Sequence, residues 1–419
     1  MATTIWLGHA LAVAQVQRAP LSGTWANTDT MSVTINGKTV AHTLTTEGNT
    51  YSEILTNAAL SLNGSEVAEF AEMTFANYSN THLEATVDTA GKPFTAATSE
   101  VTAGDGELED FAIATGVKGP HCLNTVENWS TGTVPTNGDH VVFEYSAVDC
   151  MYELDALAAV QPASLTIRQS YTGKIGLPRT NQDDASTYVE YRPRYLEIGP
   201  TVVSIGDGDG SGSGRIMLDF GGNDANVTVY DKSSRAETGI PAVLLKGTNS
   251  SNQLCVIRGD VGVAFFAGET ADLSGGLNIT YRTSEAGDAE ISCGSGTTLG
   301  DVAQSGGKLT IASNATTIDQ YAGQLTLKAA AAITTLTAEG TIYDYSSGTI
   351  GTLNLTGVYD HSQATVAKTI TNAILYAGAT YRDPHGVITL TNGLDLYRCK
   401  PSDVSIVSAP HQTWTPTAI

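Results

Sequence analysis

Charged residues are scarce in this chain of 419 residues. Asp, Glu, Lys and Arg together make up 15% of it, against about a quarter in typical soluble proteins. Only 21 residues are Lys or Arg while 43 are Asp or Glu, so the formal net charge is −22. Binding to nucleic acid depends on basic side chains that neutralise phosphates. The composition therefore argues against a nucleic-acid partner.

Cysteine is also rare and carries no pairing pattern. The five cysteines are odd in number, widely spaced, and include no CxxC pair. A disulfide framework or a zinc site would need an even set or closely spaced ligands. We interpret the cysteines as small buried hydrophobic residues of a protein made in a reducing cytoplasm. They are Cys122, Cys150, Cys255, Cys293 and Cys399.

Long apolar runs are missing as well, because no stretch approaches the ~18 residues that span a membrane. The apolar run from Ile5 to Val16 has no Lys or Arg before it and is interrupted by Gly8 and His9. A secretory signal needs a basic start, so we expect none here. Histidine and serine motifs of hydrolases and metalloenzymes, such as HExxH and GxSxG, do not occur. We therefore predict no catalytic residues.

A glycine-led repeat is the most informative feature that the chain does contain. Units such as GKLTI, GQLTL and GTIYD begin at Gly307, Gly323, Gly340, Gly357 and Gly378, at intervals of 16, 17, 17 and 21 residues. Each unit pairs a short alternating strand with a polar corner and a second β-rich stretch. Such short periods without helical spacing predict the rungs of a parallel β-solenoid, whose apolar faces are buried by stacking. We expect Leu309, Ile311, Leu325, Leu327, Leu353 and Leu355 to point into one core.

Residues 1–118 predict a small α+β attachment module in front of the solenoid. Asn36-Gly37 lies between alternating residues and indicates a β-hairpin. Thr50 and Glu53 form a capping box, and Asn63-Gly64 ends the helix that follows. The apolar stripe of this helix contains Ile54, Leu55, Ala58, Ala59 and Leu62. With further strands at 72–78, 82–88 and 94–98, the predicted order is ββαβββ.

The rest of the chain predicts a mainly β rod in two parts. We expect irregular, decorated solenoid coils over 119–300, then regular rungs and a C-terminal tail over 301–419. The rod opens with Asn128-Trp129-Ser130, followed by Val134-Pro135 and Gly138-Asp139, a pattern NWS-x-G-x-VP-x-x-GD. This pattern is similar to the opening unit of many bacterial and phage β-helical surface proteins. Together with IWLG at residues 5–8, it resembles the layout of uncharacterised β-helical structural proteins of tailed phages and prophages.

The resemblance implies a structural role. We expect a non-enzymatic component of a phage-like virion, assembled in the host cytoplasm and displayed on the particle as a head decoration or as a tail spike or fibre. Its expected partners are other virion proteins, two further copies of itself in a homotrimer, and host-surface polysaccharide. A polysaccharide-degrading tailspike enzyme and a bacterial adhesin at the cell surface are the alternatives.

Two segments contain candidate binding residues. In Asp207–Gly214 oxygen donors alternate as in calcium loops, and Asp207, Asp209, Ser211 and Asp219 are the candidate ligands. However, calcium loops usually place a bidentate carboxylate near position twelve, where this chain has Leu218. We favour a glycine turn without a cofactor, and calcium is the alternative.

The second segment is the densest group of ionisable residues, Asp183, Asp184, Glu190, Arg192 and Arg194. Tyr188, Tyr191 and Tyr195 are interleaved with them and are candidate platforms for carbohydrate. The favoured interpretation is a polar loop packed on the rod, in which the tyrosines bury their rings and leave their hydroxyls wet.

Overall fold

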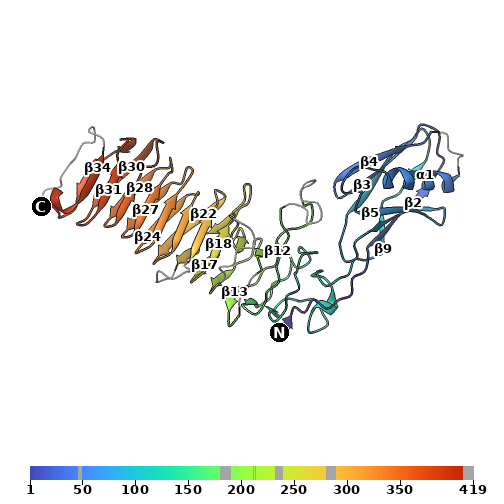
Figure 1. Ribbon diagram of the computed structural model, residues 1–419, viewed down its shortest axis with the longest axis horizontal. Helices are drawn as coiled ribbons and strands as arrows, with labels where there is room; N and C mark the ends of the chain where they lie inside the picture. Colours follow the sequence, from blue (N-terminus) through green and yellow to red (C-terminus); the bar gives the residue numbers. More distant parts are fainter. Residues whose placement is uncertain are drawn as a thin grey trace.

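The computed structural model describes residues 1–45, 50–179, 190–210, 212, 214–231, 239–279 and 289–408. It is an elongated molecule in which a long rod of stacked strands ends near the C-terminus and a smaller module lies at the opposite end (Figure 1). The fold is mainly β, with long parallel sheets, as the repeat predicts.

Two parallel sheets form the sides of the rod. The first sheet runs from β1 to β32, with β19 (Ala271–Leu273) and β33 (Leu394–Leu396) paired beside this path. Its strands, from one end of the rod to the other, are β1 (Thr3–Ile5), β10 (His140–Phe143), β11 (Ser164–Arg168), β13 (Val202–Asp207), β15 (Asn226–Val229), β17 (Gln253–Val256), β20 (Gly276–Ile279), β22 (Thr297–Gln304), β24 (Ala315–Gln320), β26 (Ile333–Ala338), β28 (Ile350–Leu355), β30 (Lys368–Leu375) and β32 (Ile388–Leu390). At ~4.8 Å between neighbouring strands, this path is about 58 Å long.

The second sheet stacks beside the first along the same axis. Its strands are β12 (Leu196–Glu197), β14 (Ile216–Asp219), β16 (Val243–Lys246), β18 (Asp260–Val263), β21 (Glu290–Cys293), β23 (Lys308–Ile311), β25 (Gln324–Leu327), β27 (Thr341–Asp344), β29 (Val358–Asp360), β31 (Thr380–Asp383) and β34 (Ser405–Ser408). The 3₁₀ turns η1 (Val126–Asn128) and η2 (Pro401–Asp403) lie outside both sheets.

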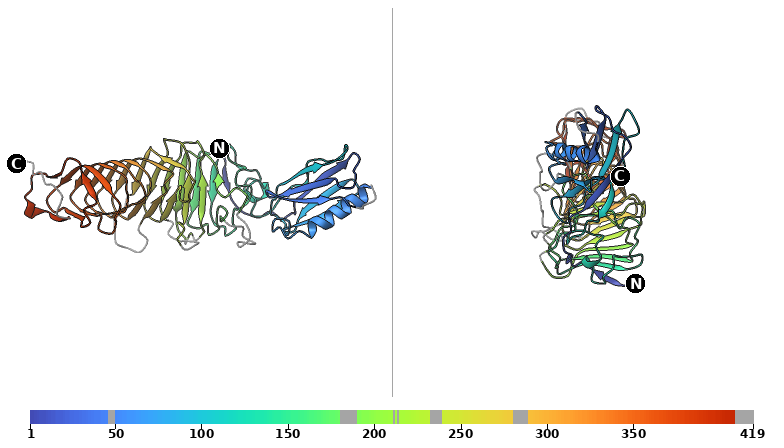
Figure 2. Two further views of the ribbon diagram at one scale, coloured as in Figure 1. Left: turned by 90° about the horizontal axis from the view of Figure 1, so that it is seen from above. Right: turned by 90° about the vertical axis from the view of Figure 1, so that its right-hand side faces the viewer.

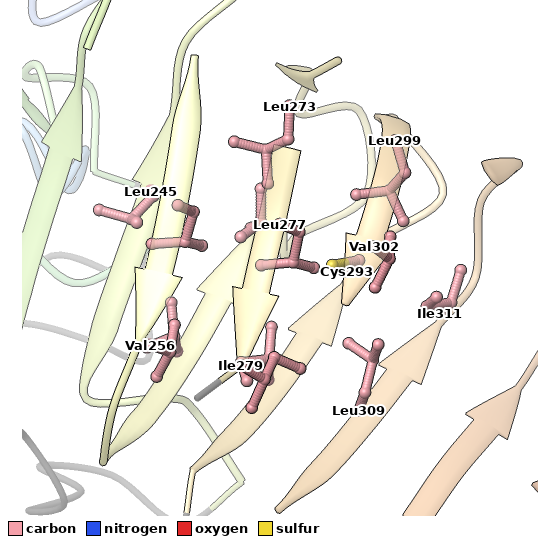
Figure 3. Packing of buried hydrophobic residues seen from close by; sticks show 14 of the residues in the cluster. Leu245, Val256, Leu273, Leu277, Ile279, Cys293, Leu299, Val302, Leu309 and Ile311 are labelled. Atoms are coloured by element: carbon pink, nitrogen blue, oxygen red, sulfur yellow. The ribbon is translucent and has the colours of Figure 1, made fainter. Parts of the chain in front are cut away.

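One continuous apolar core fills the space between the sheets. Leu309 and Ile311 lie in register with Leu325 and Leu327 in the second sheet, and Leu353 and Leu355 face the same core from the first sheet. All six side chains are fully buried, which confirms the predicted core. Figure 3 shows this stacking in part of the core, where Val256 lies in register with Ile279 in the first sheet and Cys293 with Ile311 in the second.

The module has its own fold and its own core. One sheet has the order β5 (Met73–Tyr78), β6 (His82–Val87), β2 (Val16–Ser22) and β8 (Glu107–Leu108), with β9 (Ala112–Thr115) also on β2. The other has β4 (Lys38–Thr43), β3 (Thr30–Ile35) and β7 (Ala96–Val101). Helix α1 (Tyr51–Asn63) contributes its predicted stripe to a buried cluster separate from that of the rod.

The predicted hairpin and helix caps of the module are confirmed. Asn36 and Gly37 both have positive φ, at 51° and 83°, between the paired residues Ile35 and Lys38. The Thr50 hydroxyl donates to the Glu53 carboxylate at 2.6 Å and accepts from its backbone N–H. The order ββαβββ is incomplete, however, because β2, β8 and β9 were not predicted.

The first residues of the chain belong to the rod, which corrects the boundary of the 1–118 module. Strand β1 pairs with β10 in parallel, Thr3 opposite His140 and Ile5 opposite Val142. Trp6 is fully buried in the core of the rod. The chain then leaves the rod and returns at adjacent points, where Val13 and Lys118 form an antiparallel bridge. The module is therefore an insertion between the first two strands of the solenoid.

Candidate functional site at the junction of rod and module

The two sequence motifs near the ends of the insertion meet in space. The Ser130 backbone N–H donates to the Ile5 carbonyl, and the Ile5 N–H donates to the Ser130 hydroxyl, both at 2.9 Å. The rings of Trp6 and Trp129 meet edge to face with centroids 5.2 Å apart. The IWLG and NWS segments thus complete the first layer of the rod together, although more than a hundred residues separate them.

Asn128 fastens both connections of the module. Its side chain is fully buried. The side-chain oxygen accepts from the Ala10 N–H on the outgoing segment at 2.8 Å. The side-chain nitrogen donates to the carbonyls of Gly119 and Cys122 on the returning segment, at 2.7 and 2.8 Å. Because such bonds fix chain direction as well as distance, Asn128 holds the two crossings in one geometry.

An arm of the rod touches the module from the side. Segments 177–179 and 190–194 run alongside each other, since the Leu177 N–H donates to the Arg194 carbonyl and the Glu190 N–H donates to the Arg179 carbonyl. From this arm the Tyr191 hydroxyl donates to the Pro93 carbonyl of the module at 2.7 Å. Burial raises the pKa of Tyr191 above its usual range, so the phenol stays a neutral donor.

The arm is stiffened by a buried ion pair. Arg192 binds both carboxylate oxygens of Glu190, at 2.7 and 2.9 Å, and both side chains are almost completely buried. The guanidinium also lies 5.0 Å from the ring centroids of Tyr152 and Tyr191. This planar ion pair holds the arm in position, because a movement that separated the two side chains would leave a buried charge without its partner.

The structure shows how the described residues of the candidate carbohydrate patch are packed. Asp183, Asp184 and Tyr188 lie outside the described residues. Tyr195 is only 5% exposed and its hydroxyl donates to Glu269 at 2.8 Å, so its ring offers no open face to a sugar. Arg194 lies 5.1 Å from the Phe266 ring centroid. The described part of the segment is packed on the rod and module, as the favoured interpretation expected, but the hydroxyls of Tyr191 and Tyr195 donate to protein acceptors and were expected to be wet.

The candidate calcium ligands lie on different sheets. Asp207 ends β13 in the first sheet and Asp219 ends β14 in the second. Asp219 binds Lys246 at 2.9 Å and accepts from the Gly221 N–H. Asp209 lies in a bend whose glycines Gly208 and Gly210 have positive φ, and Ser211 is outside the described residues. Within those residues, no group of three or more His, Cys, Asp or Glu is arranged to hold a metal.

A second polar cluster is buried in the distal rungs and was not predicted. Lys368 donates to Asp344, to the Ser346 hydroxyl and to the Gly348 carbonyl at 3.0, 2.7 and 2.7 Å. The Tyr359 hydroxyl donates to the same Asp344 carboxylate oxygen as Lys368, at 2.6 Å. Burial lowers the pKa of Lys368 and raises that of Tyr359. All hydrogens of the ammonium group have acceptors, which suits a structural ion pair.

Cysteines are free in the structure, and three of the five are buried. Burial raises the pKa of the Cys122 thiol to about 12, so this sulfur stays protonated beside the junction and donates weakly to the Gly91 carbonyl.

No helix among the described residues is long and apolar enough to cross a membrane. Comparisons of the chain with protein-family models, curated proteins and solved structures find no match.

Proposed function

We propose that the chain is a non-enzymatic structural protein of a phage-like virion, displayed on the particle surface as a homotrimer. The observation that carries this proposal is the junction. Both crossings of the module are bonded to Asn128, and the arm bonded to Pro93 braces the module from a third point. A stiff rod with a firmly attached, separately cored module suits an object that must dock at one end and project at the other (Figure 2).

The chemistry of the rod supports a structural role. A groove of about 870 Å³ runs over the rungs between Ser295 and Gly351, and its lining consists of Ser, Thr, Asn, Ala, Gly, Leu and Ile. Glycosidic cleavage normally uses two facing carboxyl groups, and the lining of this groove supplies none. The carboxylates Asp344 and Glu190 serve buried ion pairs. That the chain belongs to a phage-like particle, on its head or on its tail, is inferred from the sequence resemblance.

Cross-linking of intact particles tests the proposal. Particles released from cells that carry the gene would be purified on a density gradient and treated with a lysine cross-linker. We expect the exposed Lys38 of the module to link to other virion proteins, and the exposed Lys308 and Lys328 of the rod to link only to further copies of the chain. Absence of the chain from the particles, or the reverse pattern of links, would contradict it. If the particles released new reducing ends from host capsule, that result would favour the alternative function, a polysaccharide-degrading tailspike enzyme.

A further inference from the structure

A pocket of about 450 Å³ lies beside the first rung, between the N-terminal turn and the segment that follows β10. Two contacts fix its walls. The Trp6 indole N–H donates to the Val148 carbonyl at 3.1 Å. Gly8 has φ +67° and lies so close to Val148 that a Cβ would come within 2.5 Å of it. The IWLG turn therefore requires glycine, and the pocket is a built feature of the rod.

Tyr145 is placed at this pocket against its own conformational preference. Its φ is +50°, in the left-handed region that residues other than Gly, Asn and Asp rarely adopt. Its side chain is 84% exposed, so burial of the ring contributes almost no stability that would offset the backbone strain. Backbone strain that serves no packing is found mainly at functional sites. Tyr145 contrasts with Tyr171, which is fully buried in the same part of the rod.

Polar groups suited to hydroxyl ligands line the same pocket as Tyr145. Glu144 and the exposed His9 both line the pocket. Glu144 is held by Arg168 at 2.9 Å, which orients its carboxylate while it retains further acceptor positions. The Ser146 hydroxyl accepts from the Val148 N–H at 3.2 Å. A pocket lined by an exposed tyrosine, a carboxylate and an imidazole matches a sugar ring, which has an apolar C–H face and hydroxyls at its edge.

We propose that this pocket binds a neutral saccharide of one or two rings, stacked on Tyr145. Its volume falls in the range of small-molecule sites. A neutral ligand is favoured over an acidic one because the chain has a net charge of −22 and Glu144 faces the pocket. The inference is independent of the proposed virion role, because it depends only on the geometry of the first rung.

Saturation-transfer NMR on the full-length protein tests this site. The probes are maltose, cellobiose, lactose and diacetylchitobiose, each at millimolar concentration. We expect transfer to the ring protons of at least one of them, weakened by about tenfold or more in Tyr145→Ala, which corresponds to the loss of one stacked ring. Tyr321→Ala is the matched control, because Tyr321 is also an exposed tyrosine of the rod, at 55%, and should leave the signal unchanged.

A second variant separates binding from folding. Asn tolerates the left-handed backbone of position 145 better than Tyr does. Tyr145→Asn should therefore melt at the same temperature as the wild type or higher, and yet lose saturation transfer. Three results would overturn the proposal: no transfer from any of the four sugars, unchanged transfer in Tyr145→Asn, or a lower melting temperature of Tyr145→Asn.

Discussion

Replacing Lys368 by Met is expected to lower the free energy of unfolding of the distal rungs by about 3–5 kcal/mol. The substitution removes the cation that faces Asp344 and leaves a buried carboxylate with only hydroxyl and backbone donors. Desolvation of an unpaired charge is far more costly than the loss of the apolar contacts of the lysine stem. Hydrogen exchange of the backbone amides in β27, β29 and β31 would measure the loss locally.

The double variant Asp344→Leu with Lys368→Met is the matched control. Position 344 lies in register with Leu327, which in turn lies in register with Ile311, so leucine would continue an existing apolar column. Replacing a buried ion pair by apolar residues of similar size is often neutral. We expect the double variant to be more stable than Lys368→Met but less stable than the wild type, because Tyr359 and Ser346 lose the acceptor that Asp344 provides. A single variant as stable as the wild type would show that the ion pair does not hold these rungs together.

Replacing Asn128 by Ala should have the second largest effect, a loss of about 3 kcal/mol or more. The variant leaves the Ala10 N–H without its partner and removes one of two donors from each of the carbonyls of Gly119 and Cys122, which also accept from backbone N–H groups. A buried group left without a partner costs about 1–3 kcal/mol, and each further lost hydrogen bond costs about 0.5–1.5 kcal/mol. Denaturant unfolding would measure the loss, and proteolysis should become faster in the segment before Asn128.

Asn124→Ala is a suitable control for the junction. Asn124 is exposed and lies only four residues away, so its substitution should change stability by less than about 0.5 kcal/mol. Equal stability of both variants would mean that the Asn128 bonds do not fasten the module.

The regular parts of the fold could be predicted because their signals are local. The glycine spacing after Gly307 indicated the stacked rungs, and Asn36-Gly37 indicated the hairpin. Strand β1 escaped prediction because three residues carry too little pattern, and its partner β10 lies far along the chain. Strand β2 contains Pro20, which normally argues against a strand with neighbours on both sides. In this sheet Pro20 lies opposite Glu109, whose N–H donates to the Pro20 carbonyl, while the Glu109 carbonyl accepts from the Thr98 hydroxyl instead of from a backbone N–H at position 20.

The sites were harder to predict because they depend on register and on packing between distant segments. Tyr195 has the same sequence signature as an exposed tyrosine, and its burial depends on packing against Met217 and Leu244 and on its bond to Glu269. Asp344 was visible as a carboxylate in the repeat. Its partner Lys368 is identified only when the rungs are aligned, since 24 residues separate the two. Nothing in the sequence marked Tyr145, because backbone strain at a non-glycine residue has no signature of its own.

Calorimetry of a chain without its module tests most directly the claim that the protein is a rod with an inserted, separately folded module. Residues 14–117 would be replaced by Asn-Gly, because Val13 and Lys118 are already bridged antiparallel, with the Val13 N–H donating to the Lys118 carbonyl at 2.7 Å, and Asn-Gly favours such a turn. We expect two unfolding transitions in the full chain, and we expect the shortened chain to retain the rod transition within a few degrees. A single transition in the full chain, or a shortened chain without cooperative unfolding, would contradict it.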